Sequence, residues 1–372
     1  MKILHIVSSI SRDAGGPARS VQGLVAGLNN AGVEAWLFTL KKRGEPWVPG
    51  IKNYRTANCE GAKGVREAVE KIIDEIHPDL VQIHSLWQMS LHEACVAARR
   101  KKVPYILTPR GCLDVWSLKQ KWLKKKIALL TYQGYDLRHA TAIHTTADDE
   151  TRQVRKLGFK QTVIQFPNGV NFPESLPSRE RTEKKRMIFL SRMHKKKGLV
   201  ELVEAWAKVR PTGWQCELVY TLNGEEEKAY EIKIKEIVEQ LGLTDDFIFT
   251  GKLLDEEKWH AYLRSDCFIL PTHTENFGIV IAEALYAGLP VITTQGAPWY
   301  DLIEYQCGWW VKQGDVDAIA NALSEATAMG REDLDRMGMR GRELVMKKYR
   351  WTEICRGMIS EYKKILSSSK EL

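Results

Sequence analysis

Two glutamates, Glu275 and Glu283, lie eight positions apart directly after a short apolar run, Cys267–Leu270, that ends at Pro271. Such a run is typical of a buried strand, and apolar residues then recur at helical spacing over 279–285, so one carboxylate falls in a strand-to-helix loop and the other on the helix. At about 1.5 Å of rise per helical residue, the pair suits two groups of ligand hydroxyls better than one metal ion. Because glutamate is common in ordinary helices, this pair alone leaves a purely structural explanation open.

The amino-terminal end of this helix is a second predicted feature of the site. The helix should open near Phe277–Ile279, where Gly278 lets the backbone approach a ligand closely. The first N–H groups of a helix lack intrahelical partners, and such an end attracts phosphate.

Basic residues follow another predicted strand, Met187–Leu190. Arg192 and Lys197 come after this strand and can converge on one anion, as a planar fork and a point charge. Lys195 and Lys196 between them fit a solvated loop. Together with the glutamate segment, these cations predict a site for a sugar that carries a diphosphate.

A glycine-containing loop after the first predicted strand is another candidate for binding a diphosphate or a sugar. Residues 11–20 include Gly15 and Gly16 and lead into an apolar helical pattern, so backbone N–H groups there can face a diphosphate or a sugar. The loop lacks the G-x-G-x-x-G turn and the acidic ribose clamp of dinucleotide-binding folds, which argues against a dehydrogenase.

These segments resemble the retaining glycosyltransferases of family 4, which have the GT-B fold. The resemblance spans nearly the whole chain. Its matching segments are Glu-x7-Glu (Glu275, Glu283), Arg-x4-Lys-Gly (Arg192, Lys197, Gly198), Gly15-Gly16, Pro167-Asn168-Gly169-Val170, Gly288-Leu289-Pro290-Val291-Ile292 and a final helix near 351–366.

The resemblance implies an α/β protein of two Rossmann-like, doubly wound domains that face each other across a cleft. It implies that Arg192 and Lys197 neutralise the leaving diphosphate, that Glu275 holds sugar hydroxyls and that Glu283 holds the ribose diol. The first three are the expected catalytic residues. The expected donor-binding set is Gly15, Gly16, Arg192, Lys197, Glu275, Asn276, Phe277, Gly278, Ile279 and Glu283.

The chain departs from the family at one position. Many members carry a histidine after the strand that corresponds to 106–108, whereas this chain has Pro109-Arg110-Gly111. The remaining histidine at a strand end of the first half is His84, which can be structural or can touch the acceptor. Arg110 can meet an acceptor phosphate or the donor diphosphate. These two residues are the acceptor-side candidates, and the general base stays unassigned.

Strands and helices alternate throughout, which is typical of parallel sheets with crossover helices. We expect an acceptor-side domain over 1–172, completed by a helix at about 351–372, and a nucleotide-sugar-binding domain over 173–350. The stretch 173–186 is interpreted as an exposed linker. The predicted strands are 3–7, 35–39, 80–83, 105–108 and 142–145, then 187–190, 216–220, 247–250, 267–270 and 291–293.

Charge is divided unevenly. Residues 1–172 hold 26 Lys and Arg against 15 Asp and Glu, whereas the remainder holds 29 against 32. No nucleic-acid-binding motif accompanies the basic half. A predicted helix over 116–133 instead combines apolar residues with lysines and fits an anionic membrane surface, although an ordinary surface helix with an inward apolar stripe is the alternative. We call its lysines the lysine cluster: Lys119, Lys121, Lys124, Lys125 and Lys126.

The remaining composition indicates a cytoplasmic protein. Seven cysteines are dispersed without zinc-ligand spacing, which favours reduced thiols. The apolar start is too short for a signal peptide, and no uncharged run reaches the length of a membrane span. We therefore expect a cytoplasmic protein. Together with the predicted helix over 116–133, this suggests a peripheral position on the inner face of the plasma membrane.

The predicted function is transfer of a sugar from a nucleotide diphosphate sugar to a lipid-linked saccharide acceptor, in lipopolysaccharide or other surface polysaccharide biosynthesis. A transferase with a soluble small acceptor and a non-catalytic sugar-nucleotide-binding protein are the alternatives. No cofactor or metal is expected, because cations and a helix end already meet the diphosphate charge. The Asp-x-Asp motif Asp315-Val-Asp317 precedes a late helix, where Asp315 is expected to be the N-cap.

Overall fold

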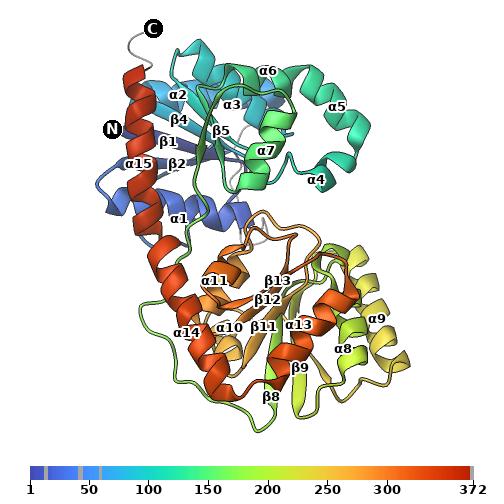
Figure 1. Cartoon of the computed structure of the whole chain (residues 1–372). Coiled ribbons are helices and arrows are strands. Elements are labelled where there is room, and N and C mark those ends of the chain that lie inside the picture. The colour runs from blue at the N-terminus through green and yellow to red at the C-terminus, as the bar shows by residue number, and fades with distance from the viewer. Residues whose placement is uncertain (12–15, 41–44, 58–60, 369–372) are drawn as a thin grey trace. The chain divides into compact units, whose positions relative to one another are not determined.

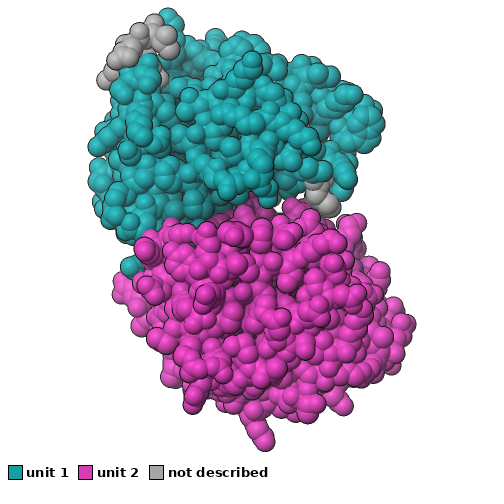
Figure 2. All heavy atoms as spheres, in the orientation of Figure 1, with its two compact units in different colours: residues 1–171, 349–372 teal, residues 172–348 magenta. Residues whose placement is uncertain are grey.

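Residues 1–11, 16–40, 45–57 and 61–368 are described by a computed structural model (Figure 1). The chain divides into two compact units, unit 1 with residues 1–171 and 349–372 and unit 2 with residues 172–348 (Figure 2).

Unit 1 is built on a seven-stranded parallel sheet with the strand order β3-β2-β1-β4-β5-β6-β7. Alternate residues of the first strand face opposite layers: Leu4 and Ile6 pack with α2 and α3, whereas Ile3 and Val7 pack with α1 and α15. Both faces of the sheet are therefore covered, as a parallel sheet requires. The strands are β1 (Lys2–Val7), β2 (Glu34–Thr39), β3 (Asn53–Thr56), β4 (Leu80–His84), β5 (Tyr105–Thr108), β6 (Ala142–Thr145) and β7 (Thr162–Gln165), and the helices are α1 (Gly16–Asn30), α2 (Gly61–Ile76), α3 (Met89–Arg100), α4 (Val115–Lys119), α5 (Trp122–Leu130), α6 (Tyr132–His139), α7 (Asp148–Lys156) and α15 (Trp351–Ser368).

Unit 2 is built on a six-stranded parallel sheet with the order β10-β9-β8-β11-β12-β13. The central strand β11, Cys267–Leu270, is wholly apolar and buried. The strands are β8 (Lys185–Arg192), β9 (Trp214–Thr221), β10 (Phe247–Gly251), β11 (Cys267–Leu270), β12 (Val291–Thr294) and β13 (Gly308–Val311), and the helices are the 3₁₀ turn η2 (Lys195–Lys197), α8 (Leu199–Val209), α9 (Glu225–Gln240), α10 (Asp255–Leu263), α11 (Ile279–Tyr286), α12 (Asp301–Glu304), α13 (Val316–Ala328) and α14 (Arg331–Lys348).

The carboxy-terminal helix α15 packs into unit 1 through Trp351. A Cβ atom on Gly23 of α1 would lie 2.3 Å from Trp351 Nε1, and one on Gly169 would lie 2.4 Å from Trp351 Cδ2. Farther along the helix, the Tyr362 hydroxyl donates to Gln82 Oε1 in β4. Glycines at these positions thus let the indole sit directly on the backbone.

Two local predictions are wrong. The stretch 173–186 is not an exposed linker throughout, because Arg179 and Arg181 form ion pairs with Asp335 and β8 already begins at Lys185. The segment 116–133 is not one helix either. Lys121 adopts the left-handed region at φ 51° and separates α4 from α5, and α6 begins at Tyr132.

No helix in the described ranges is long and apolar enough to cross a membrane. The six cysteines within those ranges are free thiols.

Candidate active site

The candidate site of unit 2 lies where the strand order reverses. β8 has β9 on one side and β11 on the other, so the loops after β8 and β11 leave the same edge of the sheet in different directions. Ligands of open parallel sheets bind at such a switch point. Arg192 and Lys197 follow β8, and Glu275 follows β11.

The two loops are joined by backbone contacts. His273 N and Thr272 Oγ1 both donate to Lys196 O, at 2.7 and 3.0 Å. Gly198 has a φ of 71°, and a Cβ atom there would lie 2.0 Å from Pro271 O. Only glycine permits this approach, so it fixes the basic loop against the glutamate loop.

Lys197 and Glu275 are brought together. The Lys197 ammonium donates to Glu275 Oε2, and the two side chains are 9% and 21% exposed. The pair is largely shielded from solvent, where an ion pair is stronger than at a surface. Glu275 N also donates to Gly296 O at 2.7 Å, which fixes the loop.

The helix end lies beside this pair. α11 begins at Ile279 after Gly278, whose φ is 82°, and a Cβ atom on Gly278 would lie 3.2 Å from Glu275 Cγ. Trp299 Nε1 donates to Phe277 O and anchors the turn. The predicted helix start at 277–279 is therefore present, with Asn276 in the same loop.

Arg192 is placed differently from Lys197. Its side chain is 50% exposed, and its Nη1 lies 3.8 Å from Glu227 Oε1. Glu227 also accepts a hydrogen bond from Asn223 N at the start of α9. In this structure each of the two predicted phosphate-binding cations thus has a glutamate as its counter-charge.

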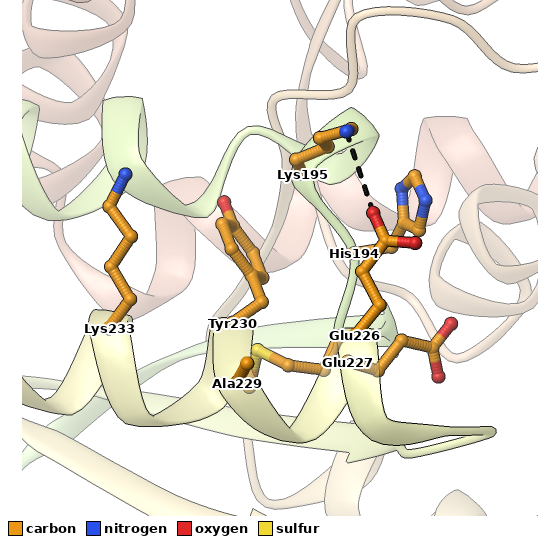
Figure 3. A pocket seen from close by; sticks show the side chains of 8 residues that line it. His194, Lys195, Glu226, Glu227, Ala229, Tyr230 and Lys233 are labelled. Atoms are coloured by element: carbon orange, nitrogen blue, oxygen red, sulfur yellow. Dashed lines mark ion pairs between the residues drawn. The ribbon is translucent and has the colours of Figure 1, made fainter.

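A cavity of about 230 Å³ lies beside Arg192, between the loop after β8 and α9. Figure 3 shows Lys195 reaching toward Glu226, with which it forms an ion pair at 3.5 Å. No predicted donor-binding residue lines the cavity. The lining residues are Met193, His194, Lys195, Glu226, Glu227, Ala229, Tyr230 and Lys233.

Glu283 is buried in the middle of α11, with its side chain 1% exposed. Lys258 Nζ on α10 lies 2.8 Å from its Oε1, and the Tyr262 hydroxyl donates to Oε2 at 3.3 Å. Sequence reasoning missed Lys258, since a single lysine in a charged amphipathic helix carries no signal of its own. The expected N-cap, by contrast, is confirmed: Asp315 Oδ1 accepts from Ala318 N at 3.0 Å.

In unit 1, Gly15 lies outside the described residues and Gly16 is the first residue of α1. His84 is fully buried at the end of β4 and stacks on His5, with ring centroids 5.4 Å apart. Burial, Arg110 and the neighbouring histidines hold the pKa of His84 well below its usual value. His84 contacts Arg110 through its Nδ1, so it supports that guanidinium from inside the unit.

Two further histidines of unit 1 are buried and neutral. Burial, and next the Arg110 charge, lower the pKa of His5 and of His144 to about 3. His144 Nδ1 bonds to the Gln82 amide at 3.1 Å, and its Nε2 bonds to Phe166 O at 3.1 Å.

Both halves of the chain match known families. Residues 173–344 match "Glycosyl transferases group 1", and residues 15–169 match "Glycosyl transferase 4-like domain". A Mycobacterium tuberculosis relative, a GDP-mannose-dependent alpha-(1-6)-phosphatidylinositol monomannoside mannosyltransferase, is 30% identical over 179 residues, which are 45% of this chain and 45% of that protein. The chain spans about half the length of the curated relatives it matches.

Solved structures agree with the fold. HepE of Anabaena in complex with UDP superimposes with a TM-score of 0.80 at 17% identity and covers 98% of this chain and 100% of its own. The lipopolysaccharide outer core galactosyltransferase WaaB in its apo form gives 0.72 at 16% identity, with 99% of each chain covered. The predicted fold of two Rossmann-like domains is therefore confirmed, and both family matches are to glycosyl transferases, the predicted enzyme class.

Proposed function

Because the chain is made of a glycosyl transferase 4-like domain and a group 1 glycosyl transferase domain, we propose that it transfers a sugar from a nucleotide diphosphate sugar with retention of configuration. The observation that carries this proposal is the Lys197–Glu275 pair at the switch point of unit 2, beside the start of α11. A cation and the amino-terminal end of a helix suit a diphosphate, and a carboxylate next to them suits sugar hydroxyls.

The proposed chemistry is mostly positioning and charge stabilisation. The acceptor oxygen forms a bond to the anomeric carbon on the face from which the nucleotide leaves, and the bond from that carbon to the diphosphate breaks. The departing phosphate oxygen takes the acceptor proton. Lys197, Arg192 and the α11 end would stabilise the negative charge that develops on the diphosphate.

The glutamates would orient the donor. Glu275 would accept hydrogen bonds from sugar hydroxyls, and Glu283, held by Lys258, would accept them from the ribose diol. We further propose that no metal takes part, because two cations and a helix end already face the diphosphate.

We propose a lipid-linked saccharide acceptor and a position at the inner face of the plasma membrane. The support is the surface of α5, where four large apolar residues face solvent while Leu129 packs on the core of unit 1; in Figure 1 this helix lies at the periphery of unit 1. Ala128 is its one buried residue in the described set. The apolar face of α5 is Trp122 (60% exposed), Leu123 (55%), Ile127 (54%) and Leu130 (72%).

These four positions fall within about 140° of the helix circumference, at 100° per residue. Next to them stands the lysine cluster, of which Lys125 turns back to Ser117 O and the Trp87 ring. Lys126 falls within this arc and the other lysines outside it, and such a mixture of exposed apolar residues and lysines fits an anionic bilayer surface. The lipid named for the mycobacterial relative and the lipopolysaccharide named for WaaB also support an acceptor of surface-glycan biosynthesis.

A single-turnover assay tests the proposal. The protein is mixed with UDP-, GDP- and ADP-sugars, one at a time, and with either detergent-solubilised bacterial lipids or free sugars as acceptors. Transfer to lipid is the expected result. Transfer to free sugars alone would favour a soluble acceptor, and nucleotide binding without any transfer would favour a non-catalytic sugar-nucleotide-binding protein.

A further inference from the structure

The guanidinium of Arg110 is a buried cation in unit 1. Arg110 follows β5, is 8% exposed and has a φ of 52°, in the left-handed region that non-glycine residues seldom occupy. Strained backbone of this kind persists where its surroundings enforce it, and it is concentrated at functional sites.

All hydrogen-bond acceptors of this guanidinium are neutral. Nη1 donates to Asn168 Oδ1 at 2.7 Å and to Ser20 Oγ at 2.9 Å. Nε and Nη2 share His84 Nδ1 at 3.3 and 3.2 Å. No carboxylate of the described residues forms an ion pair with Arg110, unlike Arg99, which pairs with Asp136 at 2.8 Å.

The Glu150 carboxylate acts on Arg110 through its charge, but it makes its hydrogen bonds elsewhere. Glu150 accepts hydrogen bonds from Gly111 N at 2.6 Å and from Thr146 N and Oγ1 at 2.8 and 3.0 Å. Burial lowers the pKa of Arg110 to about 10, so its side chain stays charged at neutral pH. His84 does not compensate this charge, since it accepts from Arg110 as a neutral ring.

A buried guanidinium whose hydrogen-bond acceptors are all neutral is costly, because Glu150 offsets its charge without contacting it. The position of Arg110 fits an anion. It follows β5, next to β4, and Ser20 brings in α1 near its amino-terminal end. The switch point of the unit 1 sheet lies between β1 and β4, and His84, which accepts from Arg110, is the last residue of β4.

We propose that Arg110, held by Asn168, Ser20 and His84, is a second anion site of the protein and binds a phosphate group of a substrate. The role in transfer rests on the proposed function. The phosphate has two sources, the diphosphate of the donor or a phosphate of the lipid-linked acceptor. A planar guanidinium already fixed by three acceptors loses little freedom when it binds a phosphate.

The proposal is tested by a substitution that places a carboxylate in hydrogen-bond contact with Arg110. Asn168→Asp is nearly isosteric and places a carboxylate at the 2.7 Å contact, so it should keep the fold and compete with any anion. The protein for this test is the full chain with Arg192→Ala and Lys197→Ala, which disables the anion site of unit 2. The probe is inorganic pyrophosphate, measured by calorimetry.

The variant with Arg192→Ala and Lys197→Ala should still bind pyrophosphate. Adding Asn168→Asp should weaken this binding by about tenfold or more, because the anion then loses the charged hydrogen bond from Arg110. Arg155→Gln is the matched control, because Arg155 also donates only to neutral oxygens, those of Phe159 and Gln161, but lies at the surface. No binding by the double variant, or binding that Asn168→Asp leaves unchanged, overturns the proposal. If the Asn168→Asp variant does not fold, Arg110→Lys, which keeps the charge but loses the fork, replaces it and should weaken binding less than Arg110→Gln.

Steady-state kinetics of the Asn168→Asp variant, with Arg192 and Lys197 intact, then distinguish a donor phosphate from an acceptor phosphate. A higher KM for the nucleotide sugar assigns the donor diphosphate, and a higher KM for the lipid acceptor assigns the acceptor phosphate. Unchanged values for both contradict a role in transfer. The pyrophosphate measurement does not depend on transfer, so failure of the proposed function and failure of this site remain distinguishable.

Discussion

Replacement of Glu275 by glutamine should make the protein bind a free nucleoside diphosphate more tightly while it transfers sugar more slowly. The Lys197 ammonium donates a hydrogen bond to the Glu275 carboxylate. A diphosphate that binds to Lys197 must therefore separate the ammonium from the carboxylate. Glutamine keeps the shape of the side chain and removes the competing charge. The ammonium is then free to meet the phosphate.

The size of the effect follows from the burial of the pair. With side chains 9% and 21% exposed, the gross attraction of two charges about 4 Å apart is about 4 kcal/mol at an effective dielectric constant of 20. Re-solvation of the freed carboxylate offsets much of this. A net gain of about 1 to 2 kcal/mol remains, which is about 5- to 30-fold in the dissociation constant.

Transfer should slow by about two orders of magnitude, because the carboxylate that orients the sugar is lost. The assay is calorimetry with UDP, GDP and ADP, followed by single-turnover transfer with the matching sugar nucleotide. Glu231→Gln is the control, since Glu231 also pairs with a lysine of unit 2, Lys235, at 2.7 Å and its loss changes the net charge equally. Weaker nucleotide binding by Glu275→Gln than by this control would refute the exchange of partners.

Three further predictions concern other parts of the chain. Arg192→Ala and Lys197→Ala should each slow single-turnover transfer by about two to three orders of magnitude with an unchanged fold, and near-normal rates would remove them from the site. Glutamine at all five positions of the lysine cluster should abolish sedimentation with anionic vesicles at low salt and spare nucleotide binding, whereas sedimentation like that of the parent would make α5 a plain solvated surface. The buried histidines have folded-state pKa values below 6.5, so the unfolded chain binds more protons and stability should fall as the pH drops from about 6.5, by up to about 1.4 kcal/mol per pH unit for each histidine. Urea unfolding of unit 1 at pH 7 and pH 5 should show a smaller loss for His144→Gln, and an equal loss would contradict the assignment.

The sequence predicted the central strands and the donor loops because their signals are local. Runs such as Cys267–Leu270 are buried on both sides and therefore wholly apolar. The edge strand β13 was missed although its sequence, Gly-Trp-Trp-Val, is apolar. The edge strands β3 and β7 were missed because half-exposed strands need no apolar run; β3, for example, reads Asn-Tyr-Arg-Thr with no buried residue. Position along the sheet, which decides this exposure, is not encoded in any short window.

Contacts between segments that lie far apart in the chain were also not predicted from the sequence. The approach of Gly198 to Pro271 and the Lys197–Glu275 pair join loops nearly eighty residues apart, and the spacing within each loop says nothing about them. Lys258 was not predicted as a site residue because a single lysine in a charged helix is not distinctive. Only its ion pair with buried Glu283 identifies it. The break at Lys121 was not foreseen either, since lysine is an ordinary helix former.

A crystal structure of the protein with the nucleoside diphosphate that binds best would show whether Lys197 exchanges Glu275 for a phosphate. We expect the diphosphate to lie between Lys197 and the start of α11, with the Lys197 ammonium moved from Glu275 to a phosphate oxygen. A nucleotide bound elsewhere, or a Lys197–Glu275 pair left intact beside the bound diphosphate, would contradict this expectation.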